Sequence, residues 1–182
     1  MNAIDLFDDA LKWLANRYNE YKFFTERDIA WTLQNHLADE IAGKNLPYKV
    51  YNDWPILPGP KRSYCADLVI KTNAHIELAV ELKYEPDHKR QEFSKGKLNP
   101  SRVCWGLKSG TTSVEADMGK ANKYVSEHVA KTAYAIFIDE GRWFQKKKRY
   151  AERPWIHWGD VKPYPVQNRE KETGQACLLG IG

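Results

Sequence analysis

The sequence is poor in the residues that build disulfide-bonded, zinc-bound and membrane-spanning proteins. Its 182 residues include three cysteines and five histidines. The cysteines form no Cys-x-x-Cys pair and the histidines lack zinc-ligand spacing, so we expect reduced thiols and no structural zinc site. No apolar run approaches the roughly 20 residues of a membrane helix, and the first residues, MNAIDLFDDALKW, are too acidic for a secretory signal. These absences favour a cytoplasmic protein without a membrane partner.

The composition is that of a globular chain. Apolar residues make up 42 % of the sequence and charged residues 29 %, which excludes an intrinsically disordered protein. The length allows one domain with a good core, and we find no internal repeat and no convincing linker. We therefore expect a single domain over residues 1–182, with a core at about 25–139 and a C-terminal extension at 140–182.

The net charge of +4 is unevenly distributed along the chain. Residues 1–60 hold 6 Lys and Arg against 9 Asp and Glu, whereas residues 83–108 hold 7 against 3 and residues 141–171 hold 9 against 3. Basic segments with interleaved aromatic residues favour a polyanion partner, most simply nucleic acid. The alternative is an ordinary solvated surface. The candidate nucleic-acid contacts are Lys61, Arg62, Lys89, Arg90, Lys120, Lys146, Lys147, Lys148 and Arg149.

Periodicity predicts the order of helices and strands. We expect helices over 3–20 and 25–42, the second capped by Thr25 and closed by Gly43. Strands are predicted over 46–54, 65–71 and 75–83. The proline-rich run PILPGPKRS is expected to break the first into a loop, and the last two form a hairpin through the turn at residues 72–74. A third helix is predicted from Thr112, with Glu115 completing a capping box, to about Ala130, followed by a buried strand over 132–139. This order predicts an α/β fold with a mixed central sheet flanked by helices.

The tail beyond residue 140 is basic and aromatic, and its pattern assigns no element. Its aromatic side chains either fill a core or form a base-stacking surface.

The stretch IELAVELKY ends an apolar strand with two charged groups on one side. Glu81 and Lys83 share a face, and pairing Ile70 with Leu78 in the hairpin places Asp67 opposite Glu81. Two carboxylates that close repel unless a proton or cation lies between them, and hard oxygen ligands suit Mg²⁺ or Mn²⁺. Lys83 would then assist at a phosphate. The alternative is a surface ion pair worth about 0–1 kcal/mol.

Together, the motif Asp67…Glu81-Leu82-Lys83 and the order of elements resemble the PD-(D/E)xK nuclease superfamily over about residues 25–139. Ala66 stands where the family name has proline, a position without a chemical role. The resemblance implies a restriction-endonuclease-like αβββαβ core, here with an extra N-terminal helix and a basic aromatic C-terminal extension. It also implies that Asp67, Glu81 and the backbone carbonyl of Leu82 bind the metal and that Lys83 is the catalytic lysine.

Many members of that family carry a glutamate on the helix before the first core strand, and Glu26 fits this position. It precedes Ile29, Leu33 and Leu37 at helical spacing, and a carboxylate on an inward stripe is costly unless it has a partner. As an alternative, Glu26 is a first-turn acid favoured by the helix dipole.

The sequence thus predicts a Mg²⁺- or Mn²⁺-dependent nuclease that hydrolyses phosphodiester bonds, with DNA favoured over RNA and endonuclease action favoured. The alternative is a non-catalytic nucleic-acid-binding or assembly module with a nuclease-like fold. Whether the chain forms a homodimer is left open.

Overall fold

The computed structural model describes residues 1–59, 62–89, 103–106, 113–144 and 146–147, together with the backbone of 155–157 and 175–180. Four of the candidate nucleic-acid contacts, Lys61, Arg90, Lys148 and Arg149, lie outside these ranges, as does Thr112.

Two helices open the chain, close to the predicted ranges. Helix α1 spans Ala3–Arg17 and ends in the 3-10 turn η1, Tyr18–Glu20. Helix α2 spans Glu26–Gly43 and starts with a capping box, in which Thr25 and Asp28 satisfy each other's backbone N–H groups. The left-handed residue that follows α2 is Asn45, with a φ of 48°, so the turn lies beyond the predicted closure at Gly43.

Six strands form one mixed sheet in the order β1-β2-β3-β4-β6-β5. The first three are antiparallel, and the pairs β3–β4, β4–β6 and β5–β6 are parallel. Their bounds are Lys49–Leu57 for β1, Tyr64–Lys71 for β2, Ile76–Glu85 for β3, Ala130–Asp139 for β4, Trp155–His157 for β5 and Gln175–Gly180 for β6. The tail that the pattern left unassigned therefore supplies two strands of the sheet.

The predicted hairpin is confirmed, including the pairing of Ile70 with Leu78. The first strand is shifted: it begins at Lys49 and continues through Pro55 to Leu57, although the proline-rich run was expected to end it at Trp54. Strand β1 lies at the edge of the sheet, where proline is tolerated, and its pairing with β2 is irregular after Pro55.

The third helix differs from the prediction at both ends. Helix α4 spans Val114–Ser126, and Ser113 caps it by accepting from the Ala116 N–H at 3.1 Å. Glu115 therefore lies in the first turn of the helix, and the predicted capping box of Thr112 with Glu115 does not form. The helix stops four residues before Ala130 because His128 takes a left-handed φ of 57° and strand β4 begins at Ala130.

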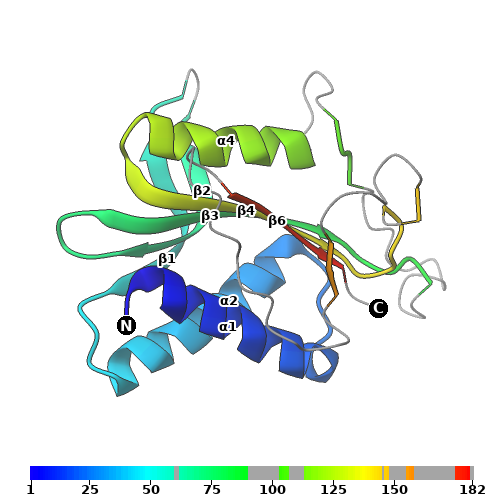
Figure 1. Cartoon of the computed structure of the whole chain (residues 1–182), viewed down its shortest axis with the longest axis horizontal. Helices are drawn as coiled ribbons and strands as arrows, with labels where there is room; N and C mark the ends of the chain where they lie inside the picture. The colour runs from blue at the N-terminus through cyan, green and yellow to red at the C-terminus, as the bar shows by residue number, and fades with distance from the viewer. Residues whose placement is uncertain are drawn as a thin grey trace.

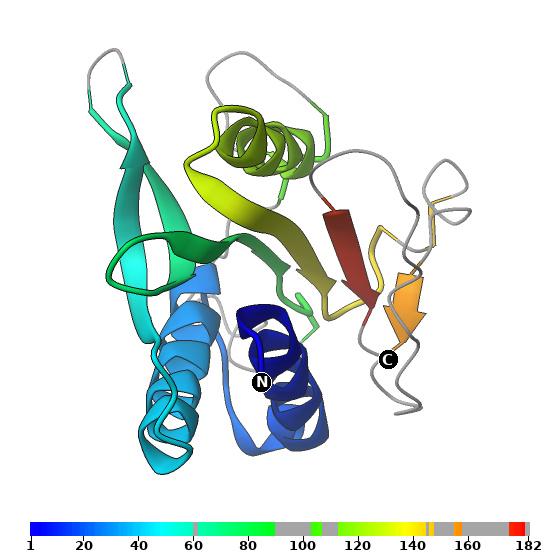
Figure 2. The ribbon, with the colours of Figure 1, turned by 60° about the vertical axis from the view of Figure 1, so that its left-hand side comes forward.

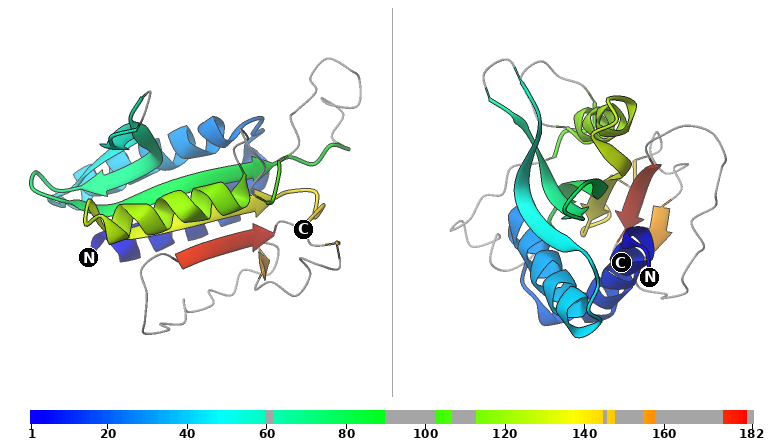
Figure 3. Two further views of the ribbon diagram at one scale, coloured as in Figure 1. Left: turned by 90° about the horizontal axis from the view of Figure 1, so that it is seen from above. Right: turned by 90° about the vertical axis from the view of Figure 1, so that its left-hand side faces the viewer.

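The helices cover the two faces of the sheet separately. In Figure 1, α1 and α2 lie below the sheet and α4 lies above it. The two faces bury different cores, one with Leu68, Leu78 and Leu82 against α1 and α2, the other with alanines of β3 and β4 against α4. Figure 2 shows the hairpin half of the sheet twisted away from the half that holds β4 and β6. Figure 3 shows α4 running along β4, as expected for the connection between β3 and β4.

None of the helices in the described ranges is long and apolar enough to cross a membrane.

Candidate active site

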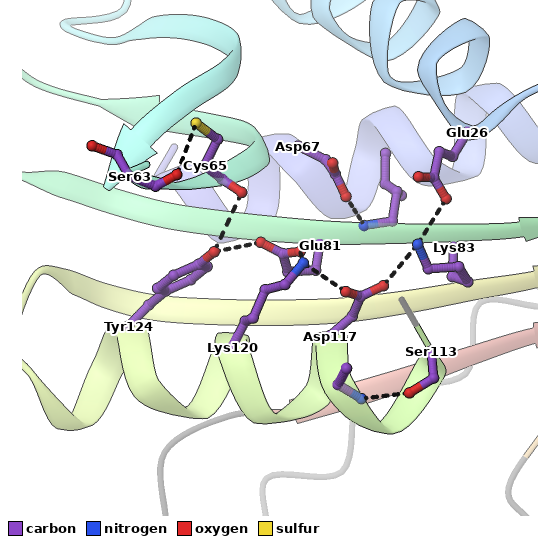
Figure 4. Close-up of polar contacts among 12 residues, drawn as sticks. Glu26, Ser63, Cys65, Asp67, Glu81, Lys83, Ser113, Asp117, Lys120 and Tyr124 are labelled. Atoms are coloured by element: carbon purple, nitrogen blue, oxygen red, sulfur yellow. Dashed lines mark hydrogen bonds and ion pairs between the residues drawn. The ribbon is translucent and has the colours of Figure 1, made fainter. Parts of the chain in front are cut away.

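Strands β2 and β3 stop pairing at the position of Asp67. The last pair in this direction is Leu68 with Val80. One residue further, the Asp67 side chain replaces the backbone pairing between the strands: its Oδ2 accepts from the Leu82 N–H at 2.6 Å. The carboxylate thus occupies the gap between two separating strands, one residue from Glu81, as Figure 4 shows.

Glu81 is buried on the face that α4 covers, with 1 % of the residue exposed. Its Oε1 accepts from the Tyr124 hydroxyl at 2.5 Å and its Oε2 from Lys120 Nζ at 2.8 Å. The same hydroxyl lies 3.4 Å from the Cys65 carbonyl oxygen of β2. Helix α4 therefore fixes both oxygens of this carboxylate.

Lys83 connects α2 and α4, which cover opposite faces of the sheet. Its Nζ donates to Glu26 Oε2 of α2 at 3.0 Å and lies 3.0 Å from Asp117 Oδ2 of α4. The contact with Asp117 is an ion pair, because this buried oxygen has no hydrogen bond among the described residues. The Lys83 side chain is only 9 % exposed, so the interpretation of a solvated surface pair does not apply here.

The structure brings together the four residues predicted for the site and adds three from α4. Glu26, Asp67, Glu81 and Lys83 come from α2, β2 and β3, and Asp117, Lys120 and Tyr124 complete the cluster (Figure 4). Lys120 was predicted as a nucleic-acid contact, and here it contacts Glu81 and Asp117 (2.7 Å). Asp117 lies at helical spacing with the buried Val114, Ala121 and Tyr124, the same kind of signal that supported Glu26 on its own helix.

Burial shifts the pKa of both β-strand carboxyls upward. Burial raises the pKa of Asp67 to about 6, although the Leu82 N–H opposes this shift. Burial likewise raises the pKa of Glu81 to about 7, the nearby Asp67 raises it further, and Lys120 opposes it. Carboxyls with pKa values this close to neutrality are frequent at functional sites, because burial and like charge are costly without a compensating function.

The two lysines are held in the charged form. Burial lowers the pKa of Lys83, but Asp117 and Glu26 outweigh it and the net shift is upward. Lys120 behaves in the same way, with burial outweighed by Glu81 and Asp117. Both groups are therefore ammonium ions at neutral pH and serve as cations, not as proton acceptors.

A cavity of about 290 Å³ opens beside the cluster, between the first turn of α2 and strands β1 and β2. Its lining includes the side chains of Glu26 and Asp67 and the exposed Arg27. Asn52 also lines it, and the buried Oδ1 atom of Asn52 has no hydrogen bond within the described part of the chain. Two of the predicted site residues thus face a space open to a ligand.

The donor chemistry of the cluster fits a hard divalent cation. Four carboxylates (Glu26, Asp67, Glu81 and Asp117) surround two ammonium groups, so negative charge is in excess, and carboxylate oxygens are the ligands that Mg²⁺ prefers. Among the described residues, however, no three His, Cys, Asp or Glu side chains lie close enough together to form a ready ligand group.

The remaining predicted basic contacts that are described lie on the surface. Arg62, Lys89, Lys146 and Lys147 are exposed, and Lys147 Nζ lies 4.9 Å from the centre of the Trp143 ring. Their contact with nucleic acid stays a prediction.

Comparison with known proteins identifies no relative: the sequence matches no protein-family profile, and no curated protein or solved structure matches it.

The raised carboxyl pKa of Glu81 predicts that the metal-free protein loses stability as the pH rises. The folded state holds this proton more tightly than the unfolded chain, so the stabilisation is complete below about pH 4.5 and is lost as the pH rises to about 7. With about 1.4 kcal/mol per pKa unit, the loss is on the order of 3 kcal/mol. Urea denaturation at both ends of this range, in a chelator, measures it. Asp67, whose pKa is also raised by burial, contributes a similar loss up to about pH 6, so Glu81→Gln should remove about half of the pH dependence. An unchanged dependence would contradict the assignment.

Proposed function

We propose that the protein is a divalent-metal-dependent nuclease that hydrolyses phosphodiester bonds, with DNA as the favoured substrate. The observation that carries the proposal is the convergence of Asp67, Glu81 and Lys83, with Glu26 from a separate helix joined to Lys83. Residues from β2, β3 and α2 meet beside one cavity, although nothing in the packing of an apolar core requires charged groups there.

The arrangement of elements supports a restriction-endonuclease-like fold. A helix, three antiparallel strands, a helix on the other face and a strand parallel to the third follow one another from α2 to β4. We propose that this αβββαβ unit is the nuclease core, that α1 is an addition before it and that the segment after residue 140 extends the sheet.

The proposed metal ligands are Asp67, Glu81 and the backbone carbonyl of Leu82, with Glu26 nearby. When bound, a divalent cation supplies an activated water and offsets negative charge on the phosphate. The chain's own residues orient the metal ligand and neutralise the substrate. Tyr124 and Lys120 hold the Glu81 carboxylate in place, and the Lys83 ammonium offers positive charge to the reacting phosphate. Since Lys120 donates to Glu81 in the metal-free arrangement, a cation would compete with it for that oxygen.

The alternative is a nucleic-acid-binding or assembly module that keeps the fold without cleavage. It is favoured by one observation, the absence of a ready group of three ligand side chains in the described ranges.

Incubation of the purified chain with supercoiled, linear and single-stranded DNA and with RNA, each with Mg²⁺, Mn²⁺ or a chelator, tests the proposal. We expect cleavage that requires the metal. Binding to nucleic acid without cleavage in any metal would select the alternative, and neither binding nor cleavage would refute both.

Glu26 offers a sharper test of the site. Glu26→Gln is expected to lower the cleavage rate at least about tenfold, or about 1.4 kcal/mol of barrier, because Lys83 loses a charged partner. Stability should change little, since the Glu26 side chain is 40 % exposed and the helix is capped by Thr25 and Asp28. Single-turnover rates and thermal melts of Glu26→Gln and Asp28→Asn decide between the two roles. Asp28→Asn should lower the melting temperature and keep the rate, and the reverse pattern would make Glu26 a helix-end acid only.

A further inference from the structure

The outward side of α2 carries an exposed indole next to the cavity. Trp31 is 63 % exposed, more than any other large hydrophobic side chain of the described residues. A single exposed aromatic residue is common on protein surfaces, so its surroundings decide what it means. Trp31 follows Ala30, which lines the cavity, and it lies one helical turn after Arg27, which lines it too.

Arg27 presents a guanidinium group at the mouth of this cavity. Its side chain is 79 % exposed and pairs at 3.5 Å with Asp53 of β1, whose side chain is 62 % exposed. An ion pair between two solvated groups is worth little, so Arg27 can exchange Asp53 for a phosphate at small cost. Guanidinium groups suit this exchange because they bind phosphate through two parallel N–H groups.

Two of the acids beside Arg27, Glu26 and Asp28, are already matched by other donors. Asp28 Oδ2 accepts from the backbone N–H groups of Phe24 and Thr25, each at 2.8 Å. Glu26 accepts from Lys83. The local negative charge is therefore partly neutralised within the fold, although residues 1–60 carry an excess of acids.

We propose that Arg27 and Trp31, here the α2 face, bind an unpaired nucleic-acid strand and lead it into the cavity beside Glu26 and Asp67. The role of that cavity rests on the proposed nuclease function, whereas strand binding does not require cleavage. An indole on a convex helix stacks only on a base whose face is free, and a duplex hides those faces. Trp31 stacks on such a base and Arg27 holds a phosphate. Trp31 lies five residues after Glu26, about 7.5 Å along the helix axis at 1.5 Å per residue.

The α2 face thereby defines the substrate class as single-stranded nucleic acid or a duplex with an unpaired segment beside the cleaved bond.

Equilibrium binding of the full-length chain tests this proposal in the presence of a chelator. The probes are labelled oligothymidylate, oligouridylate and a mixed-sequence DNA duplex of equal length, followed by fluorescence anisotropy. We expect Trp31→Leu to weaken single-strand binding about tenfold, because it keeps an apolar side chain but loses the stacking ring. Duplex binding should stay within about twofold. Trp31→Phe should recover most of the affinity. The two single strands show whether the strand bound is DNA, RNA or either.

Two further variants complete the test, the first as a control. Trp143→Ala removes another exposed indole, 44 % exposed and close to Lys147, and should leave the preference for single strands unchanged. Arg27→Gln should weaken binding. It should also lower the slope of log affinity against log salt by about one, as expected for the loss of one phosphate contact.

Several outcomes overturn the proposal. An unchanged affinity of Trp31→Leu for single strands, or an equal loss on the duplex, would show that the indole does not stack on bases. Sedimentation that shows a dimer abolished by Trp31→Leu would make the α2 face a contact between copies of the chain. Selective strand binding without metal-dependent cleavage would refute the nuclease function alone, and cleavage that ignores Trp31 would refute the α2 face alone.

Discussion

Replacing Lys83 with methionine is expected to lower the cleavage rate by about a thousandfold, with nucleic-acid affinity nearly unchanged. The ammonium group is held between Glu26 and Asp117, 9 % exposed, and both neighbours keep it charged at neutral pH. Removing one fixed charge that faces a reacting phosphate typically costs a factor of about 10²–10³ in rate. The loss should appear in single-turnover rates at saturating substrate, because the proposed role of the group is in the chemical step.

The same substitution has a second cost, in stability. Asp117 is 3 % exposed, and without Lys83 it keeps one of its two cation partners, Lys120 at its Oδ1, while its Oδ2 is left without a cation within the described residues. Leaving a buried charge without any partner typically costs about 3–5 kcal/mol, so the loss of one partner of two should cost less than this. The double variant Lys83→Met/Asp117→Asn removes that charge and should recover much of the stability but not the rate. A Lys83→Met protein that cleaves at the wild-type rate while folded would reduce Lys83 to a structural ion pair.

The second large effect is expected from Glu81→Gln, which should weaken metal binding and cleavage together. The amide keeps the size of the side chain and can still accept from Tyr124, but it offers no charge to a cation. We expect the affinity for Mn²⁺, measured by calorimetry without nucleic acid, to fall at least about tenfold, equivalent to about 1.4 kcal/mol. Cleavage should fall by a larger factor.

Glu77→Gln is the matched control for Glu81→Gln. Glu77 lies on the same strand and pairs with the exposed Lys131 at 2.8 Å, away from the cluster. It should leave metal affinity and cleavage unchanged. If Glu81→Gln bound Mn²⁺ as tightly as the wild type, Glu81 would be no metal ligand, and the buried network with Lys120 and Tyr124 would be structural.

The sequence was most informative where chemistry and strand period coincide. Alternation in β3 fixed which residues share a face, and the short turn after Lys71 fixed the hairpin register at Ile70 and Leu78. Asp67 and Glu81 could therefore be placed beside each other before any coordinates. Glu26 was predicted from the family resemblance, and its place on an inward helical stripe beside apolar neighbours gave separate support.

Helix boundaries and the sheet edge were less predictable. The residues that cap a helix are set by local competition, and Ser113 displaced the box expected at Thr112. Pro55 was taken as a breaker, yet an edge strand has one side without ladder hydrogen bonds and accepts proline. Strand β6 pairs with β4, more than thirty residues earlier in the chain, and β5 pairs with β6, which follows it. No local pattern encodes such partners.

By itself, the sequence determined that two acids and a lysine share one side of a hairpin, because a strand's period of two and a tight turn are local properties. Only the tertiary structure decided what surrounds them. Packing of α4 against β3 placed Asp117, Lys120 and Tyr124 in contact with Glu81 and Lys83. Because β2 separates from β3 at this point, the Leu82 N–H donates to the Asp67 side chain and not to the backbone of β2. Burial, charge balance and the resulting pKa shifts are sums over contacts between distant segments, and they exist only once those segments have packed together.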